Sequence, residues 1–234
     1  MKAIILAGGL GTRISEETDT KPKPMVLLDD KPIIWHLMNS FAEQGIQDFI
    51  IATGYLGQVI HSWIDDLDSP WRVTALDTGA ETMTGGRIRQ CLEYVGKEKV
   101  FATYGDGLGN VNLSALLRFH EHQQRIATVT AVRPPARFGV LESSNGLVTH
   151  FGEKRQLDAG WINGGYFVLE PSVVDYIDSD EEPFESYALP KLVDNRQLSA
   201  YHHEGFWQPM DTLRERNELA ELAKNPNPVW LQPN

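Results

Sequence analysis

The chain has 234 residues, of which 41% are hydrophobic and 23% are charged, proportions of a globular protein long enough to bury a sizeable core. Its net charge of −11, without any basic tract, argues against a nucleic-acid partner. A single cysteine excludes an internal disulfide, and no apolar run approaches the ~18 residues of a membrane span, so we expect a cytoplasmic protein with no membrane partner.

Short apolar runs in the first half are typical of buried strands, and they fall at residues 3–7, 48–53, 72–76 and 100–104. Helical patterns separate them. The first starts at Pro32, which suits a first helical turn, and stops at Gly45; others are predicted at residues 57–64, 86–95 and 113–124. This alternation predicts an α/β fold with a doubly wound, mostly parallel, Rossmann-like sheet.

The rhythm changes after a further strand predicted at residues 127–132. Residues 139–142 and 147–151 flank Ser143-Ser144-Asn145-Gly146, whose Asn-Gly pair is a hairpin signal, so we expect a small antiparallel addition. Strands at 161–169 and 199–203 and a helix at 211–223 follow. No linker divides the chain, which predicts one domain over residues 1–234, and Asn225-Pro226-Asn227-Pro228 suggests a loose tail at 225–234.

The most informative segment follows the first strand. It reads Leu6-Ala7-Gly8-Gly9-Leu10-Gly11-Thr12-Arg13, and Lys21-Pro22-Lys23-Pro24-Met25 comes shortly after it. Glycines let backbone N–H groups approach phosphate oxygens, while an arginine and a lysine supply positive charge. The spacing matches neither the dinucleotide fingerprint nor the Walker loop. The alternative is a plain glycine-rich turn, with Lys21 and Lys23 as solvated charges.

Together with further motifs, this segment resembles the sugar-1-phosphate nucleotidyltransferases, and within them the cytidylyltransferases that act on glucose 1-phosphate. The motifs span most of the chain: Asp77-Thr78-Gly79, Met83-Thr84-Gly85-Gly86-Arg87, Tyr104-Gly105-Asp106-Gly107, Arg137-Phe138-Gly139, Ile162-Asn163-Gly164-Gly165-Tyr166-Phe167-Val168 and Gly205-Phe206-Trp207-Gln208-Pro209-Met210-Asp211-Thr212. The resemblance implies an enzyme that binds CTP and a sugar 1-phosphate, uses Mg²⁺, and releases pyrophosphate in a direct in-line displacement.

The resemblance also assigns residues in the nucleotide-binding half, about residues 1–132. Arg13 and Lys23 are the expected catalytic residues, and Asp106 and Asp211 are the expected Mg²⁺ ligands. The expected nucleotide-binding residues are Leu6, Ala7, Gly8, Gly9, Leu10, Gly11, Thr12, Arg13, Lys23, Thr82, Thr84, Arg87 and Gly105. Without the resemblance, each of these residues also has an ordinary structural role. Asp106 fits a turn, and Asp211 and Thr84 fit the N-cap position of a helix.

The sugar phosphate is expected in the second half, about residues 133–224. There the resemblance points to Glu153, Lys154, Asn163 and Gly164, although Arg155 stands where the family's Glu-Lys-Pro element has proline. A glycine such as Gly164 equally fits a β-bulge. The segment 65–70 is shorter than in these cytidylyltransferases, so a homo-oligomer is compatible with the resemblance but no specific assembly carries over.

Two alternatives stay open. One is the same reaction with another base or another sugar, such as UTP or dTTP in place of CTP. The other is a non-catalytic nucleotide-binding module on the same fold. Such modules typically lose charged catalytic positions, whereas Arg13, Lys23, Asp106, Lys154 and Asp211 are all present here.

Overall fold

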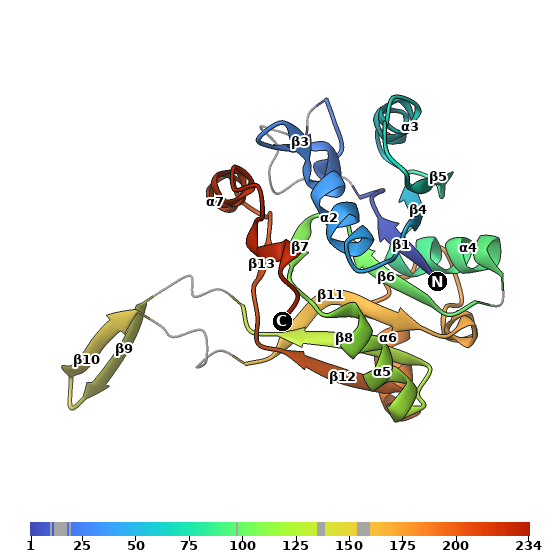
Figure 1. The fold of residues 1–234 in the computed structure, drawn as a ribbon. Coiled ribbons are helices and arrows are strands. Elements are labelled where there is room, and N and C mark those ends of the chain that lie inside the picture. The colour runs from blue at the N-terminus through green and yellow to red at the C-terminus, as the bar shows by residue number, and fades with distance from the viewer. Residues whose placement is uncertain (10, 12–17, 19, 97, 135–138, 154–159) are drawn as a thin grey trace.

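A seven-stranded sheet forms the centre of the computed structural model, which describes residues 1–9, 11, 18, 20–96, 98–134, 139–153 and 160–234. The strand order is β12-β8-β11-β6-β1-β4-β5, and only β11 runs antiparallel to its neighbours (Figure 1). The bounds are β12 (Leu198–His203), β8 (Ala127–Val132), β11 (Ile162–Leu169), β6 (Val100–Tyr104), β1 (Lys2–Leu6), β4 (Asp48–Thr53) and β5 (Arg72–Asp77). The expected mostly parallel α/β sheet is confirmed.

Helices cover both faces of this sheet, as doubly wound folds require. On one face lie α2 (Ile33–Ala42), α3 (Gly57–Asp65), α5 (Leu113–Gln123) and α7 (Leu213–Ala223); on the other lie α4 (Thr84–Val95) and α6 (Ala188–Asp194). Successive residues of β1 point to opposite faces of the sheet. Ala3 and Ile5 join the first hydrophobic core, under α2, α3, α5 and α7, and Ile4 and Leu6 join the second, under α4 and α6. Strand β1 is therefore buried on both faces, which explains its unbroken apolar sequence.

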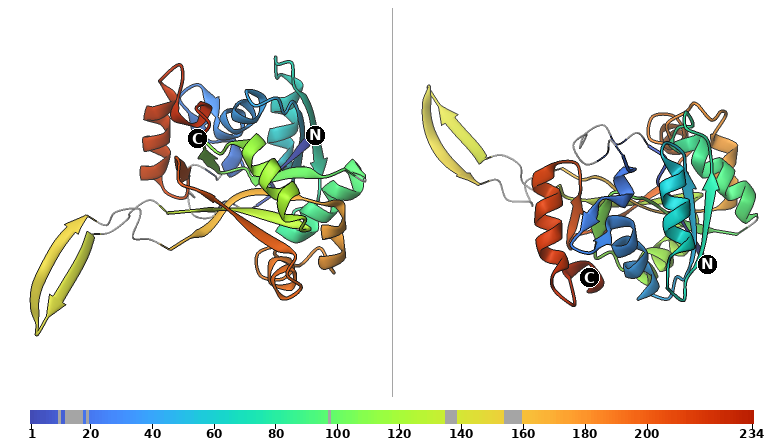
Figure 2. Two further views of the ribbon diagram at one scale, coloured as in Figure 1. Left: turned by 60° about the horizontal axis from the view of Figure 1, so that its bottom comes forward. Right: turned by 90° about the horizontal axis from the view of Figure 1, so that it is seen from above.

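The hairpin signal at Asn145-Gly146 is confirmed. Strands β9 (Gly139–Ser144) and β10 (Leu147–Glu153) pair antiparallel, and Asn145 and Gly146 have φ values of 51° and 80°. Positive φ at both central residues suits the two-residue turn of a twisted hairpin. The hairpin extends away from the body of the molecule in all the ribbon views (Figures 1 and 2).

Two local expectations were wrong. Pro32 is the N-cap of α2 rather than a residue of its first turn. The C-terminal residues are also not a loose tail, because the side chain of Trp230 is only 1% exposed and packs in the first core. Asn110 ties this segment down further, since its Nδ2 donates to the carbonyl of Gln232 at 2.9 Å and its own carbonyl accepts from Asn234 N at 3.0 Å.

Across the described residues, no helix has the length and hydrophobicity needed to cross a lipid bilayer.

Candidate active site

The glycine-rich segment leaves the carboxyl end of β1, at the edge where parallel α/β sheets bind ligands. Backbone hydrogen bonds fix its start, because Ala7 N donates to Ala52 O at 2.9 Å and Gly105 N donates to Leu6 O at 3.0 Å. Gly9 is exposed, and a Cβ added there would meet no atom of the described residues within 4 Å. The space above Gly9 is therefore open to a ligand. Leu10, Thr12 and Arg13 lie outside the described residues.

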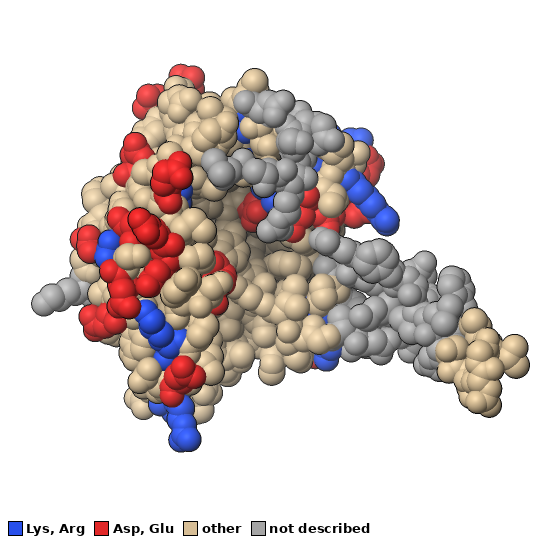
Figure 3. All heavy atoms as spheres, turned by 180° about the vertical axis from the view of Figure 1, so that it is seen from behind, with Lys and Arg blue, Asp and Glu red and all other residues tan. Residues whose placement is uncertain are grey.

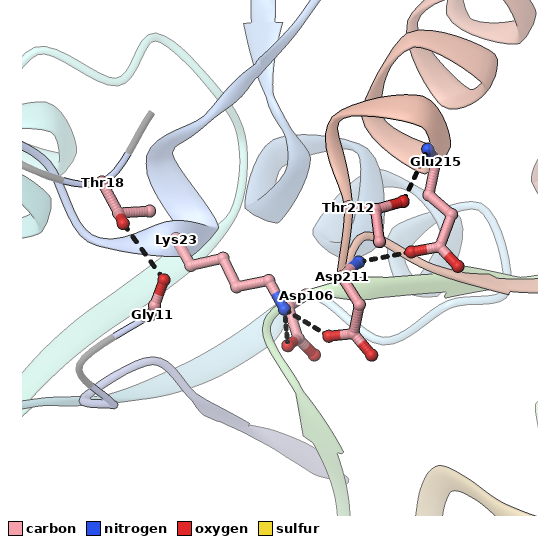
Figure 4. Close-up of polar contacts among 7 residues, drawn as sticks. All are labelled: Gly11, Thr18, Lys23, Asp106, Asp211, Thr212 and Glu215. Atoms are coloured by element: carbon pink, nitrogen blue, oxygen red, sulfur yellow. Dashed lines mark hydrogen bonds and ion pairs between the residues drawn. The ribbon is translucent and has the colours of Figure 1, made fainter. Parts of the chain in front are cut away.

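Gly11 follows with a φ of 66°, a conformation that favours glycine. Its carbonyl accepts a hydrogen bond from Thr18 Oγ1 at 3.1 Å (Figure 4). A Cβ added at Gly11 would lie 3.3 Å from Lys23 Cβ, so the loop packs directly against the lysine segment. The two motifs that were separate in the sequence are thus adjacent in space.

Lys23 is the centre of the charged site. It begins the 3₁₀ helix η2 (Lys23–Met25), and its ammonium lies 2.7 Å from Asp106 Oδ2 and 2.8 Å from Asp211 Oδ1 (Figure 4). The residue is 7% exposed, so the lysine side of both ion pairs is shielded from water, whereas the Asp106 side chain is 36% exposed. Burial alone lowers the pKa of Lys23, but the charges and hydrogen bonds of Asp106 and Asp211 outweigh burial and raise it. The lysine is therefore a permanent cation.

Two very short strands bring the distant aspartates together. Strand β7 (Gly107–Gly109) follows Asp106, β13 (Trp207–Pro209) precedes Asp211, and the two strands pair antiparallel. One further hydrogen bond, from Met210 N to Asp106 O at 2.8 Å, continues the pairing to the site itself. Neither strand was expected from the sequence, although Gly107, Trp207 and Pro209 belong to the quoted motifs.

The start of α7 holds Asp211 from the other side. Thr212 is the N-cap, with its Oγ1 accepting from Glu215 N at 3.2 Å, and Glu215 Oε2 accepts from Asp211 N at 2.8 Å (Figure 4). This reciprocal arrangement resembles a capping box. Asp211 itself is not the N-cap, and its Oδ1 pairs with Lys23.

The donor set fits Mg²⁺. Because Asp106 Oδ2 and Asp211 Oδ1 lie 2.7 and 2.8 Å from one nitrogen, they can be no more than 5.5 Å apart, the sum of these distances. Within the described part of the chain, no group of three or more His, Cys, Asp or Glu side chains could hold a metal. Two carboxylates are enough for Mg²⁺, which typically takes its remaining ligands from phosphates and water.

The side chains at residues 82–87 that are expected to bind the nucleotide make internal contacts. Thr82 Oγ1 donates to Thr78 O at 2.5 Å, and Thr84 Oγ1 donates to Glu185 Oε2 at 2.7 Å while accepting from Phe184 N at 2.8 Å. Arg87 is 3% exposed and lies beneath the glycine-rich loop. Their role in nucleotide binding stays a prediction.

The expected sugar residues are only partly described. Asn163 Nδ2 donates to the hydroxyl of Tyr104 at 3.2 Å, and its Oδ1 accepts from Gly165 N at 2.8 Å. The register of β11 against β8 shifts between Asn163 and Phe167, so Gly164 lies at a bulge or irregularity of the ladder. Gly164 accepts from Trp207 Nε1 at 2.7 Å. Glu153 ends β10, and Lys154 lies outside the described residues.

Glu185 was not expected from the sequence, yet it connects the two halves of the site. One of its oxygens accepts from the Tyr104 hydroxyl and the other from Thr84. Tyr104 also accepts from Asn163. A continuous chain of hydrogen bonds therefore runs from Thr84, which is expected to bind the nucleotide, to Asn163, which is expected to bind the sugar phosphate. Glu185 follows Asp180, Glu181 and Glu182 closely, so the sequence offers no signal that separates it from a solvated acidic run.

Seen from behind, the surface of the molecule is hollowed near its centre, and acidic side chains gather to one side of the hollow (Figure 3). An anionic substrate would therefore depend on local cations and N–H groups rather than on the overall field.

Residues 2–215 match the family model described as nucleotidyl transferase. The chain belongs to this family. It is 45% identical over 253 aligned residues, covering 98% of both chains, to a protein named glucose-1-phosphate cytidylyltransferase from Salmonella typhi. It is 39% identical over 252 residues, covering 98% of this chain and 99% of the other, to a probable glucose-1-phosphate cytidylyltransferase of Bacillus subtilis.

Two solved structures have the same fold as this chain. HddC from Yersinia pseudotuberculosis superposes with a TM-score of 0.75 at 25% identity, covering 94% of this chain and 98% of that one. A UDP-glucose pyrophosphorylase complexed with UDP-glucose superposes with a TM-score of 0.71 at 18% identity, covering 95% and 98%. The resemblance drawn from the motifs is thus confirmed at the level of the family and the fold.

Proposed function

We propose that this nucleotidyl transferase moves the cytidylyl group of CTP to glucose 1-phosphate, giving CDP-glucose and pyrophosphate. The observation that carries the reaction class is the convergence of Lys23, Asp106 and Asp211 beside an open glycine-rich loop. The choice of CTP and glucose 1-phosphate is supported by the 45% identical relative, which aligns over almost the whole of both chains.

In the proposed reaction, a phosphate oxygen of the sugar 1-phosphate attacks the α-phosphorus of CTP. The new P–O bond forms as the bond to the β-phosphate oxygen breaks, and its electron pair leaves with pyrophosphate. Two like charges about 4 Å apart repel by roughly 4 kcal/mol at an effective dielectric of 20. The main tasks of the protein are therefore to neutralise the negative charges of the two phosphate substrates and to align their reacting groups. No covalent intermediate is needed.

Each charged residue has a defined task in this proposal. Asp106 and Asp211 would hold Mg²⁺, which when bound supplies positive charge to the phosphates. Lys23 then exchanges its carboxylate partners for the α-phosphate and stabilises the charge that accumulates there. Its raised pKa keeps it protonated throughout. Arg13 is proposed to act on the triphosphate, and Glu153 and Lys154 on the sugar phosphate.

The single cysteine supports a cytoplasmic location, and a homo-oligomer stays a prediction. Relatives with other substrates define the second candidate. A mannose-1-phosphate guanyltransferase of Debaryomyces hansenii is 30% identical over 227 residues, covering 91% of this chain and 63% of the other protein. GTP and mannose 1-phosphate therefore belong in the substrate panel.

The test is pyrophosphate release from CTP, UTP, dTTP or GTP with glucose or mannose 1-phosphate, in the presence of Mg²⁺ or of a chelator. We expect CTP with glucose 1-phosphate to react fastest, and the chelator to stop the reaction. Faster reaction with another pair would replace the proposed substrates, and no release with any pair would refute the proposed enzyme.

A further inference from the structure

Trp207 ties the strand that leads to Asp211 to the strand expected to hold the sugar. It lies in β13, four residues before Asp211, and its indole Nε1 donates to the carbonyl of Gly164 in β11 at 2.7 Å. Strand β13 belongs to the two-stranded ribbon with β7, whereas β11 belongs to the central sheet. This side-chain hydrogen bond therefore joins two separate sheets beside the candidate site.

The acceptor lies where β11 departs from regular pairing. The pairing of β11 with β8 stops at Asn163 and resumes at Phe167, and its pairing with β6 begins only beyond Gly165. Gly165 has a φ of 77°, and a Cβ added at Gly164 would lie 2.5 Å from Val132 Cγ1, so both positions favour glycine. Because glycine has no side chain that could fix its peptide unit by packing, the orientation of this segment depends on partners such as the indole.

A second aromatic residue holds the same segment from the other expected metal ligand. The hydroxyl of Tyr104 accepts from Asn163 Nδ2 at 3.2 Å. Tyr104 precedes Asp106 by two residues, as Trp207 precedes Asp211 by four. Each of the two carboxylates is thus preceded in the chain by an aromatic side chain that hydrogen-bonds to the irregular segment of β11.

We propose that Trp207 is a positioning residue that fixes the sugar-binding segment of β11 relative to the two carboxylates. Its hydrogen bond to Gly164 O orients the backbone next to Asn163, the residue expected to bind the sugar. Because Trp207 and Asp211 lie close together on one stretch of chain, the indole also sets where this backbone lies relative to Asp211. The inference rests on the proposed function, since it requires the sugar to bind beside Asn163, and it gives Trp207 a task that needs no contact with either substrate.

The test compares the binding of CDP-glucose and CDP by isothermal titration calorimetry with Mg²⁺ present, because the ratio of the two affinities reports the glucose unit. Trp207→Phe keeps an aromatic ring and removes the N–H donor to Gly164 O. Trp230→Phe is the matched control, since Trp230 packs in the first core and its Nε1 has no hydrogen-bond partner among the described residues.

We expect Trp207→Phe to bind CDP-glucose about tenfold more weakly than the wild type and CDP within about twofold of it, on the scale of one lost hydrogen bond. In turnover, the KM for glucose 1-phosphate should rise by a similar factor while the KM for CTP stays unchanged. A merely structural role would lower the melting temperature without changing the ratio of affinities. Trp230→Phe should keep the wild-type ratio even if it is less stable.

If Trp207→Phe does not fold, benzothienylalanine at position 207 decides, because this analogue has the shape of tryptophan but no N–H group. Equal weakening of both ligands in the Trp207 variant, unchanged binding of both, or the same change of ratio in Trp230→Phe would overturn the positioning role. A wild-type protein that binds neither ligand would instead refute the proposed function, and the inference with it.

Discussion

Replacing Lys23 by methionine tests the charged centre of the site directly. The change removes the cation and leaves Asp106 and Asp211 with oxygens no more than 5.5 Å apart. At an effective dielectric of 20, two negative charges at that distance repel by about 3 kcal/mol. The Asp106 side chain is 36% exposed, so water screens part of this repulsion. We expect the free energy of unfolding to fall by about 2 kcal/mol, or roughly 4–8 °C in melting temperature.

The assay is urea unfolding with a chelator present and again with Mg²⁺. In the proposed site, Mg²⁺ replaces the missing cation, so it should restore most of the stability of Lys23→Met while turnover stays low. Lys21→Met is the control, because Lys21 lies in the same Lys-Pro-Lys-Pro run but is not an ion-pair partner of Asp106 or Asp211. A Lys23→Met protein as stable as the wild type in chelator would refute the electrostatic reasoning, and a loss that Mg²⁺ does not reverse would refute the metal site.

Two further predictions concern groups outside this centre. Glu185→Gln should lower the free energy of unfolding by about 2 kcal/mol, which is the scale of hydrogen bonds to a charged group. It should also raise the KM for sugar phosphate. Exposed Glu181→Gln is the control, and equal behaviour of the two variants would contradict the bridging role of Glu185. Burial lowers the pKa of His120, which is 1% exposed, so the unfolded chain takes up a proton that the folded chain does not. Neutral His120 contributes its full stabilisation above pH 6.5, which is the pKa of a histidine in the unfolded chain. As the pH falls from 6.5 toward the lower pKa of His120 in the folded protein, the free energy of unfolding decreases by up to about 1.4 kcal/mol per pH unit. Urea unfolding between pH 7 and 5 measures this slope, which should become smaller in His120→Gln; an unchanged slope would contradict the assignment.

The main strands were predictable because burial on both faces leaves a strong sequence pattern. The predicted strands at 48–53, 100–104 and 127–132 have the observed bounds of β4, β6 and β8. Strands β7 and β13 could not be found in this way, since each has three residues and neither is long enough to show a period. Yet their pairing is what brings Asp106 to Asp211, so only the family resemblance linked the two aspartates beforehand.

Other parts of the site depend on contacts that leave no trace in sequence. Arg87 binds backbone carbonyls, which every residue has, so no partner residue type indicates its role. The expected loose tail was wrong for a different reason. Asn-Pro repeats are typical of irregular chain, but Trp230 close behind them supplies enough apolar surface to anchor the segment in the core.

The two buried cations of the site differ in what neutralises them, and this difference orders their tasks. Lys23 already faces two carboxylates, so its charge is neutralised locally until a metal takes over those carboxylates. Among the described residues, Arg87 donates hydrogen bonds only to neutral oxygens. In the proposed reaction, Lys23 therefore contributes charge stabilisation only once the phosphates and the metal are in place, whereas Arg87 fixes the strand ends beneath the glycine-rich loop.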